Sequence, residues 1–231
     1  MDAQLFLAVT EQEMEDFLPP AAAYMACRFS PYSGGLTNLP AHLPPGSILL
    51  LEDSMPIAGH DPQTVAEQLT ELIYRFSPCA LLLDFQNPVS DEGSRMTEAL
   101  LQMFPCPVAV TEPYASMHDG CPVFLSPPPV DTPLQAHLAP WQSRDIFLEV
   151  TGDRQQFTVT AEGCTAAPLP SGTTHNTPHR DPKLHCHYGV EVFEDKAVFT
   201  LQRTREDLLE LAEEALQLGV RSAVGLYQEL K

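Results

Sequence analysis

Short apolar runs that end abruptly in polar residues are the feature that most limits how this chain can fold. The clearest is the stretch 79–88, CALLLDFQNP, in which an apolar run is followed by an acid, an aromatic residue, an amide and a proline. Continuous aliphatic runs of this length are typical of strands buried on both faces in a parallel sheet. Because side chains alternate along a strand, Asp84 and Gln86 are expected to point the same way.

These runs alternate with helical patterns along the chain. Asp61 followed by Pro62 is a helix start, an N-cap and then a proline in the first turn, and apolar residues follow at helical spacing. A second helix is predicted over 92–103. Strand, helix, strand, helix at this spacing indicates right-handed crossovers and a parallel sheet. The predicted parallel strands are 5–9, 23–29, 48–51, 80–85, 108–112, 123–126, 146–150 and 223–227.

This order of strands predicts an α/β fold, a TIM-type (β/α)₈ barrel with abbreviated helices. Only about ten residues separate the strands that end at 112 and begin at 123, which is too few for a full crossover helix. A β-rich insertion over 151–203 is expected before the last helix, so 1–231 is expected to be a single barrel domain. An open doubly wound sheet with a small β appendage is the alternative.

Within the insertion, the sequence predicts hairpins and one long loop. Gly152–Asp153 is expected to turn the strand 146–150 into a hairpin with 157–160, and 190–193 is expected to pair with 197–201. The stretch 163–182 is rich in threonine, proline, glycine and histidine, which predicts a loop. Thr204, with Asp207 three residues later, then predicts a capping box and the start of the last helix.

The charge balance excludes several classes of partner. The chain has 12 lysines and arginines against 31 acidic residues, a net charge of −19. Phosphate backbones and anionic lipid surfaces would be repelled, so neither nucleic acid nor a membrane is an expected partner. No basic and apolar leader opens the sequence, and no apolar run approaches the roughly 20 residues that cross a bilayer. We therefore expect a soluble, cytoplasmic protein; the sequence does not identify a protein partner.

The elements around residues 61–104 resemble the corresponding part of the family 18 glycoside hydrolases, the chitinase-like barrels. In that family the fourth strand carries D-x-x-D-x-D-x-E, followed by an aromatic residue and a proline. The same frame here reads Cys79, Leu82, Asp84 and Gln86, then Asn87 and Pro88. The third acid of the motif is therefore kept as Asp84, whereas Gln86 stands in the place of the glutamate.

The resemblance implies a substrate-assisted chemistry that this chain has lost. In the family, the glutamic acid protonates the glycosidic oxygen, and a neighbouring aspartate positions the acetamido group of the substrate, which is the nucleophile. Gln86 has nearly the shape of a glutamic acid but cannot donate a proton as an acid. The resemblance thus implies a noncatalytic or divergent barrel that binds a glycan or another small ligand through Asp84 and Gln86. It also implies a β-rich insertion where residues 151–203 lie.

Two other functions remain open. Asp84, Glu52 and Glu112 are each at the C-terminal end of a predicted strand, and clustered carboxylates can perform acid/base catalysis or hold a divalent metal such as Mg²⁺. An active hydrolase or a metal-dependent enzyme is therefore one alternative. Asp53 lies in the same region, but an acceptor for loop amides is the simpler interpretation of its role. The other alternative is an acidic protein-interaction scaffold that uses its last helix.

Aromatic residues and histidines complete the set of candidate side chains. Tyr114 and Tyr227 lie at strand ends and are expected to form walls on which a sugar ring could stack. Four histidines that lie close together could complete a tetrahedral zinc site, but their spacing matches no standard zinc motif, and no cofactor is expected. These four are His175, His179, His185 and His187.

Overall fold

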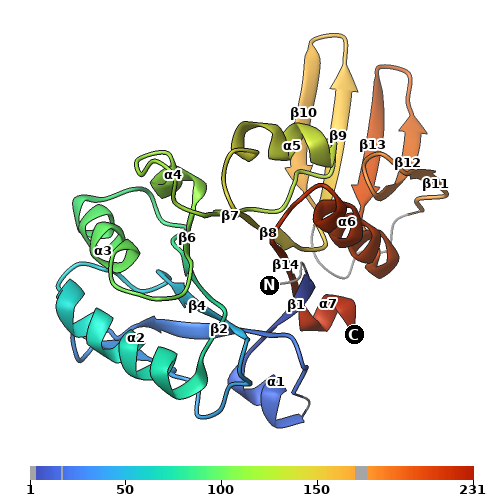
Figure 1. Ribbon diagram of the computed structural model, residues 1–231. Coiled ribbons are helices and arrows are strands. Elements are labelled where there is room, and N and C mark those ends of the chain that lie inside the picture. Colours follow the sequence, from blue (N-terminus) through green and yellow to red (C-terminus); the bar gives the residue numbers. More distant parts are fainter. Residues whose placement is uncertain (1–3, 17, 170–175) are drawn as a thin grey trace.

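Parallel strands form a closed barrel in the computed structural model, which describes residues 4–16, 18–169 and 176–231 (Figure 1). The barrel closes because β1 pairs in parallel with both β14 and β2. The predicted (β/α)₈ barrel is therefore confirmed, and an open sheet is excluded. The barrel strands are β1 (Gln4–Val9), β2 (Ala22–Phe29), β4 (Ile48–Glu52), β5 (Ala80–Asp84), β6 (Val108–Thr111), β7 (Val123–Leu125), β8 (Ile146–Val150) and β14 (Ser222–Leu226). A two-residue strand, β3 (Leu36–Thr37), pairs antiparallel with the end of β2.

Alternation along the strands divides the apolar side chains of the barrel into two layers. Ala80 and Leu82 of β5 belong to the cluster that fills the barrel interior, to which the other barrel strands also contribute. Leu81 and Leu83 belong to the larger cluster between the barrel and its helices. The alternation predicted for β5 is confirmed, and it turns Asp84 toward the axis at the C-terminal end of the strand.

The helices that surround the barrel are unequal in length. α2 (Pro62–Phe76) begins as predicted, because the Asp61 carboxylate accepts a hydrogen bond from the backbone N–H of Thr64 at 3.1 Å. α6 (Arg205–Gln217) begins with the predicted capping box of Thr204 and Asp207. The other helical segments are α1 (Glu11–Asp16), α3 (Asp91–Leu101), α4 (Glu112–Ala115), α5 (Leu134–Leu138), the 3₁₀ turn Ala139–Trp141 and α7 (Tyr227–Leu230). α4 is a single turn, as expected for the short connection between β6 and β7.

A search of the described helices finds none that is both long enough and apolar enough to span a bilayer.

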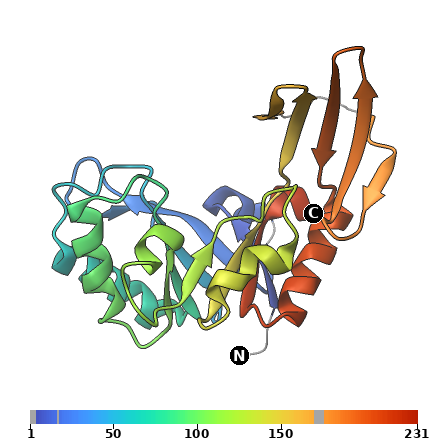
Figure 2. The same ribbon diagram turned by 90° about the horizontal axis from the view of Figure 1, so that it is seen from above.

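A second sheet, which we call the projecting sheet, lies between β8 and α6 in the chain. It extends away from the barrel, as Figure 2 shows from above. Its strands run antiparallel in the spatial order β10-β9-β13-β12-β11. They are β9 (Arg154–Thr160), β10 (Gly163–Pro168), β11 (His179–Asp181), β12 (Cys186–Val192) and β13 (Lys196–Gln202). The predicted pairing of 190–193 with 197–201 is confirmed.

Two other predictions for this region are wrong. β8 forms no hairpin with β9, because β8 pairs with β7 and β14 in the barrel, whereas β9 pairs with β10 and β13. The predicted loop 163–182 contains β10 and β11, while its residues 170–175 lie outside the described part of the chain. All residues of β10 are exposed. This edge strand therefore has no alternation of apolar and polar residues from which it could be predicted.

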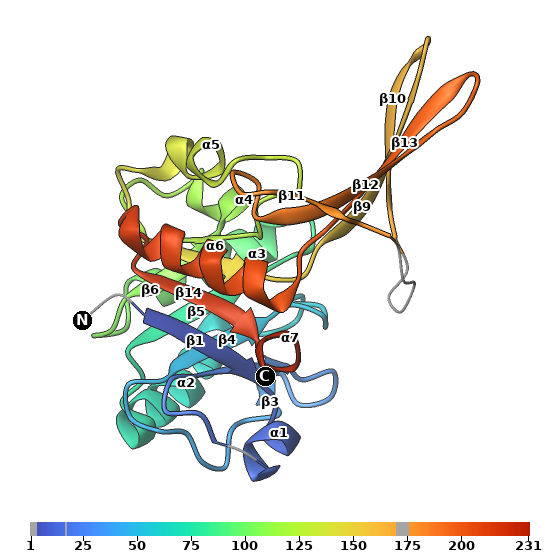
Figure 3. The ribbon, with the colours of Figure 1, turned by 90° about the vertical axis from the view of Figure 1, so that its right-hand side faces the viewer.

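The base of the projecting sheet is tied to the barrel by Arg203, whose side chain is only 4% exposed. Its guanidinium donates to the carbonyl oxygens of Pro128 at 2.5 Å, Pro129 at 3.2 Å and Leu184 at 3.4 Å. Beside it, Val130 packs with apolar residues of the sheet. Beyond this base the long strands extend past the barrel, as Figure 3 shows.

Candidate functional site

A small cavity of about 60 Å³ lies at the C-terminal ends of the barrel strands. Its wall is apolar apart from one threonine and three carboxylates. The residues that line it are Ala8, Met25, Leu50, Glu52, Asp84, Phe124, Glu149, Thr151, Val224 and Leu226. Because the active sites of (β/α)₈ barrels lie at this end, the cavity is the primary candidate site.

Asp84 lines this cavity, and Gln86 contacts Asp84. The side-chain amide of Gln86 donates a hydrogen bond to Asp84 Oδ1 at 2.5 Å, so the two side chains do point the same way. Burial raises the pKa of Asp84, and the negative charges of Asp53 and Glu52 raise it further, against the lowering effect of the Gln86 hydrogen bond. Asp84 is therefore an acid in a half-desolvated site with one neutral donor.

Glu52 lies beside Asp84, because the two residues are partners in the register of β4 and β5. Its carboxylate is 3.5 Å from the guanidinium of Arg28 and accepts a hydrogen bond from the Ser54 hydroxyl at 3.0 Å. Arg28 is itself on the neighbouring strand β2. Glu52 is therefore the carboxylate of the cavity whose charge is best balanced.

Glu112 is at the rim of the barrel mouth rather than among the cavity residues. It is the first residue of α4, and its carboxylate accepts from the Ser126 hydroxyl, with oxygen–oxygen distances of 2.7 and 2.9 Å. This contact connects the ends of β6 and β7. The predicted group of Asp84, Glu52 and Glu112 is thus brought to one end of the barrel, with Glu112 at its edge.

The third carboxylate of the cavity, Glu149, was not predicted from the sequence. It is on β8, where Phe147 faces the barrel interior and Leu148 and Val150 face outward, so alternation turns Glu149 inward. Burial raises the pKa of Glu149 to about 7, and the negative charge of Asp84 adds to the effect. A lone acid inside an otherwise apolar strand, at an inward position, is the signal that could have identified it.

Asp53 is a structural acid, as the simpler interpretation predicted. It is buried, and its carboxylate accepts from the backbone N–H of Gln86 at 2.8 Å and of Asn87 at 3.1 Å. The Asn87 side chain in turn donates to the backbone carbonyl of Asp53. These bonds hold the loop after β5 against the loop after β4, which fixes the backbone that carries Gln86.

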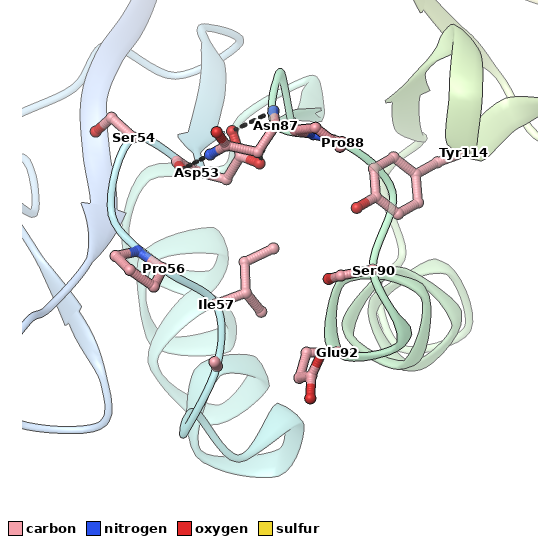
Figure 4. Close-up of a pocket in the computed structure, with 10 residues that line it drawn as sticks. Asp53, Ser54, Pro56, Ile57, Asn87, Pro88, Ser90, Glu92 and Tyr114 are labelled. Carbon is pink, nitrogen blue, oxygen red and sulfur yellow. Dashed lines mark hydrogen bonds between the residues drawn. The ribbon is translucent and has the colours of Figure 1, made fainter.

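A second, more open pocket of about 360 Å³ lies on the outer side of the same two loops. Figure 4 shows Asp53 and Asn87 on one side of it, with Ile57 between the loops and Ser90, Glu92 and Tyr114 across from them. Tyr114 is 1% exposed, and its ring packs edge-on against Phe85 with ring centres 5.7 Å apart. Tyr114 therefore lies in the outer core and does not line the cavity at the barrel mouth.

Tyr227 follows β14 as the first residue of α7 and packs against the outer apolar cluster. The Lys231 ammonium lies 5.3 Å from its ring centre. Tyr227 is not among the residues that line the mouth cavity.

Of the four candidate histidines, His185 and His187 contact acids of α6. His185 precedes β12 with a positive φ of 46° and is hydrogen-bonded to Glu214 at 2.6 Å, while His187 on β12 is hydrogen-bonded to Asp207 at 2.8 Å. His179 on β11 is exposed, and His175 lies outside the described residues. No group of three histidines, cysteines or acids suited to a metal ion is found in the described part of the chain.

Comparison with known proteins places the barrel among solved structures. No protein-family profile matches the chain. No curated protein matches it either. A class V chitinase from Nicotiana tobaccum superposes with a TM-score of 0.59 at 7% identity, over 99% of this chain and 94% of the chitinase. The chain has a chitinase-like fold.

Two further structures support the same fold. The chitinase-like agglutinin of Robinia pseudoacacia gives a TM-score of 0.57 at 11% identity, over 99% of this chain and 95% of the agglutinin. The spore cortex-lytic enzyme SleL of Bacillus cereus gives 0.55 at 10% identity, over 100% of this chain and 71% of SleL. The tobacco chitinase has also been solved as a Glu→Gln variant in complex with NAG4.

Proposed function

We propose that this chain binds an oligosaccharide built from N-acetylglucosamine at the C-terminal mouth of the barrel and does not hydrolyse it through the residue at position 86. The observation that carries the proposal is the contact of Gln86 with Asp84, a residue that lines the mouth cavity. This pair offers a sugar an amide, which can donate to and accept from hydroxyl groups, and a carboxylate, which accepts from them.

The amide group of Gln86 supports binding without acid catalysis. The resemblance in sequence aligns Gln86 with the proton-donating glutamate of family 18, and an amide does not ionise to release a proton. Its side chain is exposed at the mouth, where a ligand can reach it. Gln86 therefore keeps nearly the shape of that glutamic acid without its acidic proton.

The structures with the same fold support a glycan as the ligand. One of them is an agglutinin, and the tobacco chitinase carries NAG4 when a glutamate has been replaced by glutamine. An amide in such a barrel is thus compatible with bound oligosaccharide. The mouth cavity is far smaller than the several hundred Å³ of a typical ligand pocket, so it would receive one substituent of a sugar that lies across the rim.

Calorimetric titration with NAG4 tests the binding site. The wild-type chain should bind, and Asp84→Asn should weaken the affinity about tenfold, because a charged hydrogen-bond acceptor is replaced by a neutral one. Glu98→Gln, which removes a charge from an exposed position of α3, is the matched control and should bind as the wild type does. Absence of binding by the wild type, or equal binding by the Asp84 variant, would contradict the proposal.

A second candidate function is hydrolysis with a different acid, which Glu149 favours. Burial raises its pKa to about 7, so a proton is available there at neutral pH, and Asp84 lines the same cavity as a possible second carboxylate. Chromatography of NAG4 after long incubation separates the two candidates. Products that vanish in Glu149→Gln but persist in Gln86→Ala would favour this second function, whereas an intact tetramer would favour binding alone.

A further inference from the structure

The mouth cavity contains more carboxyl groups than there are cations to pair with them. Glu52, Asp84 and Glu149 all line it, and Glu112 and Glu229 lie close enough to raise the pKa of Glu149. Arg28 is 3.5 Å from Glu52. Within residues 4–16, 18–169 and 176–231, neither Asp84 nor Glu149 forms an ion pair with a lysine or an arginine. The cavity therefore has an excess of acid on an apolar wall.

A neutral sugar substituent does not relieve this excess. An acetamido group has one N–H donor, whereas a protonated amine has three donors and a positive charge. A ligand that covers the mouth removes water from the carboxylates, and a buried charge without a partner is costly. A cation at the same position would instead be attracted to Asp84 and Glu149 together, and more strongly than in water because the surroundings are apolar.

The size of the cavity also favours a small cationic group. Its volume of about 60 Å³ suits a substituent and not a whole sugar ring. Its apolar wall includes Leu50, Phe124 and Val224, which would contact the carbon skeleton of the ring that bears the substituent.

We propose that the mouth selects amino sugars with a free ammonium group, that is, de-N-acetylated glucosamine units, over their N-acetylated forms, and that Glu149 determines this selectivity together with Asp84. The inference rests on the proposed function, since it assumes that an oligosaccharide lies across the mouth. It goes beyond the proposed function by specifying that the preferred sugar is positively charged. Binding selects the form of the ligand whose amine is protonated.

Paired calorimetric titrations with a glucosamine tetramer and with NAG4, at neutral pH, test this selectivity. The glucosamine tetramer should bind about tenfold more tightly than NAG4 in about 0.15 M salt, with a larger ratio at low salt, because screening weakens the attraction. Glu149→Gln and, separately, Asp84→Asn should each reduce the ratio several-fold. The use of two variants keeps the test decisive if one of them folds poorly.

A net charge of −19 attracts any cationic oligomer to the surface, so a matched control is needed. Glu98→Gln removes the same charge at an exposed position of α3 and should leave the ratio unchanged. NAG4 should also compete with the glucosamine tetramer for the protein if both occupy the mouth.

The possible outcomes separate this inference from the proposed function. Tighter binding of NAG4, equal binding of the two tetramers, or a ratio that Glu149→Gln and Asp84→Asn leave unchanged would overturn the selectivity while the proposed function stood. If neither tetramer binds, both the proposed function and the selectivity are overturned. A ratio that falls in both mouth variants and not in Glu98→Gln supports the inference.

Discussion

The amide nitrogen of Gln86 lies 2.5 Å from Asp84 Oδ1 and donates a hydrogen bond to it. The contact joins the last residue of β5 to the loop that follows, whose backbone Asp53 holds in place. It supplies Asp84 with a neutral donor where the family 18 motif would have a second carboxyl group. The charge of the mouth and its chemistry both depend on which group stands at position 86.

Replacing the amide by a carboxyl group should make the mouth sensitive to pH. In Gln86→Glu two carboxyl groups adjoin, so at least one of their pKa values rises above its ordinary value. A carboxyl group with a raised pKa in the folded state lowers stability as pH rises. We expect the variant to lose about 1 kcal/mol relative to wild type between pH 5 and 7, measured by urea unfolding.

Gln86→Met is the control for that variant, because it removes the hydrogen bond without adding a charge. Its difference from wild type should change less between the two pH values than that of Gln86→Glu, because Asp84 loses a donor but gains no neighbouring charge. An equal pH dependence of the two variants would show that position 86 is not electrostatically coupled to Asp84. The carboxylate variant should also be assayed for turnover of N-acetylglucosamine polymers, since it restores the group that the family uses as an acid.

Glu149 should lower the stability of the protein as pH rises toward neutrality. Its pKa is raised from 4.5 to about 7 by burial and by neighbouring acids, so the folded state binds a proton that the unfolded state has lost. Folding is therefore disfavoured progressively across this interval. As the pH rises from about 4.5 to about 7, the free energy of unfolding of Glu149→Gln should increase by about 3 kcal/mol relative to that of the wild type. Urea unfolding of both proteins at several pH values checks this, and a constant difference would contradict it.

Gly93, near the start of α3, is required by the tyrosine packed against it. A Cβ at this position would overlap the Tyr114 hydroxyl and lie 3.0 Å from ring carbon Cζ. Alanine normally stabilises a helix interior by about 1 kcal/mol relative to glycine. Here we expect Gly93→Ala to destabilise the protein by about 2 kcal/mol through overpacking.

A double-mutant cycle identifies the cause of that loss. Tyr114→Phe removes the overlapping oxygen, so the alanine should cost at least about 1 kcal/mol less in the Tyr114→Phe background than in wild type. Thermal or urea unfolding of the four proteins provides the comparison. Additive effects would mean that the hydroxyl does not cause the strain.

Asp207 links the capping box of α6 to the projecting sheet. It is fully buried, and it accepts from Thr204, from His187 at 2.8 Å and from Arg180 at 3.1 Å. Burial acts to raise the pKa of Asp207, but these hydrogen bonds outweigh it and hold the pKa below 3.8. Its contribution to stability is therefore present above pH 3.8 and is lost as pH falls through the lowered value. Asp207→Ala should cost about 2 kcal/mol or more at neutral pH.

Hydrogen exchange shows which strands are destabilised by Asp207→Ala. Amides of β11 and β12 should lose more protection than those of β5 in Asp207→Ala, because the lost contacts hold the projecting sheet. Glu206→Ala changes an exposed acid in the same turn and should have little effect. Uniform loss of protection would mean that Asp207 acts only as a helix cap.

The barrel could be predicted because its elements carry strong local signals. Asp61 and Pro62 mark the start of α2, and the aliphatic run of β5 alternates as a strand with an interior and an exterior side must. The same alternation placed Asp84 and Gln86 together. These features depend on neighbours in the sequence, which is why they can be read from it.

The features that escaped prediction depend on contacts distant in the sequence. Glu149 stands inside an apolar strand, so only the closed barrel shows that it faces Asp84 and the other acids. Tyr114 follows a strand end, but the single turn of α4 directs its ring into the outer core. β10 is an exposed edge strand whose partner is decided by the sheet and not by its own composition.

A crystal structure of the protein soaked with NAG4 tests the central claim most directly. We predict an unbroken tetramer across the C-terminal mouth of the barrel, with one sugar over the cavity and within hydrogen-bonding distance of Asp84 and Gln86. A tetramer bound elsewhere, such as on the projecting sheet, or cleaved products in the mouth, would contradict the claim that this barrel binds the glycan without hydrolysing it.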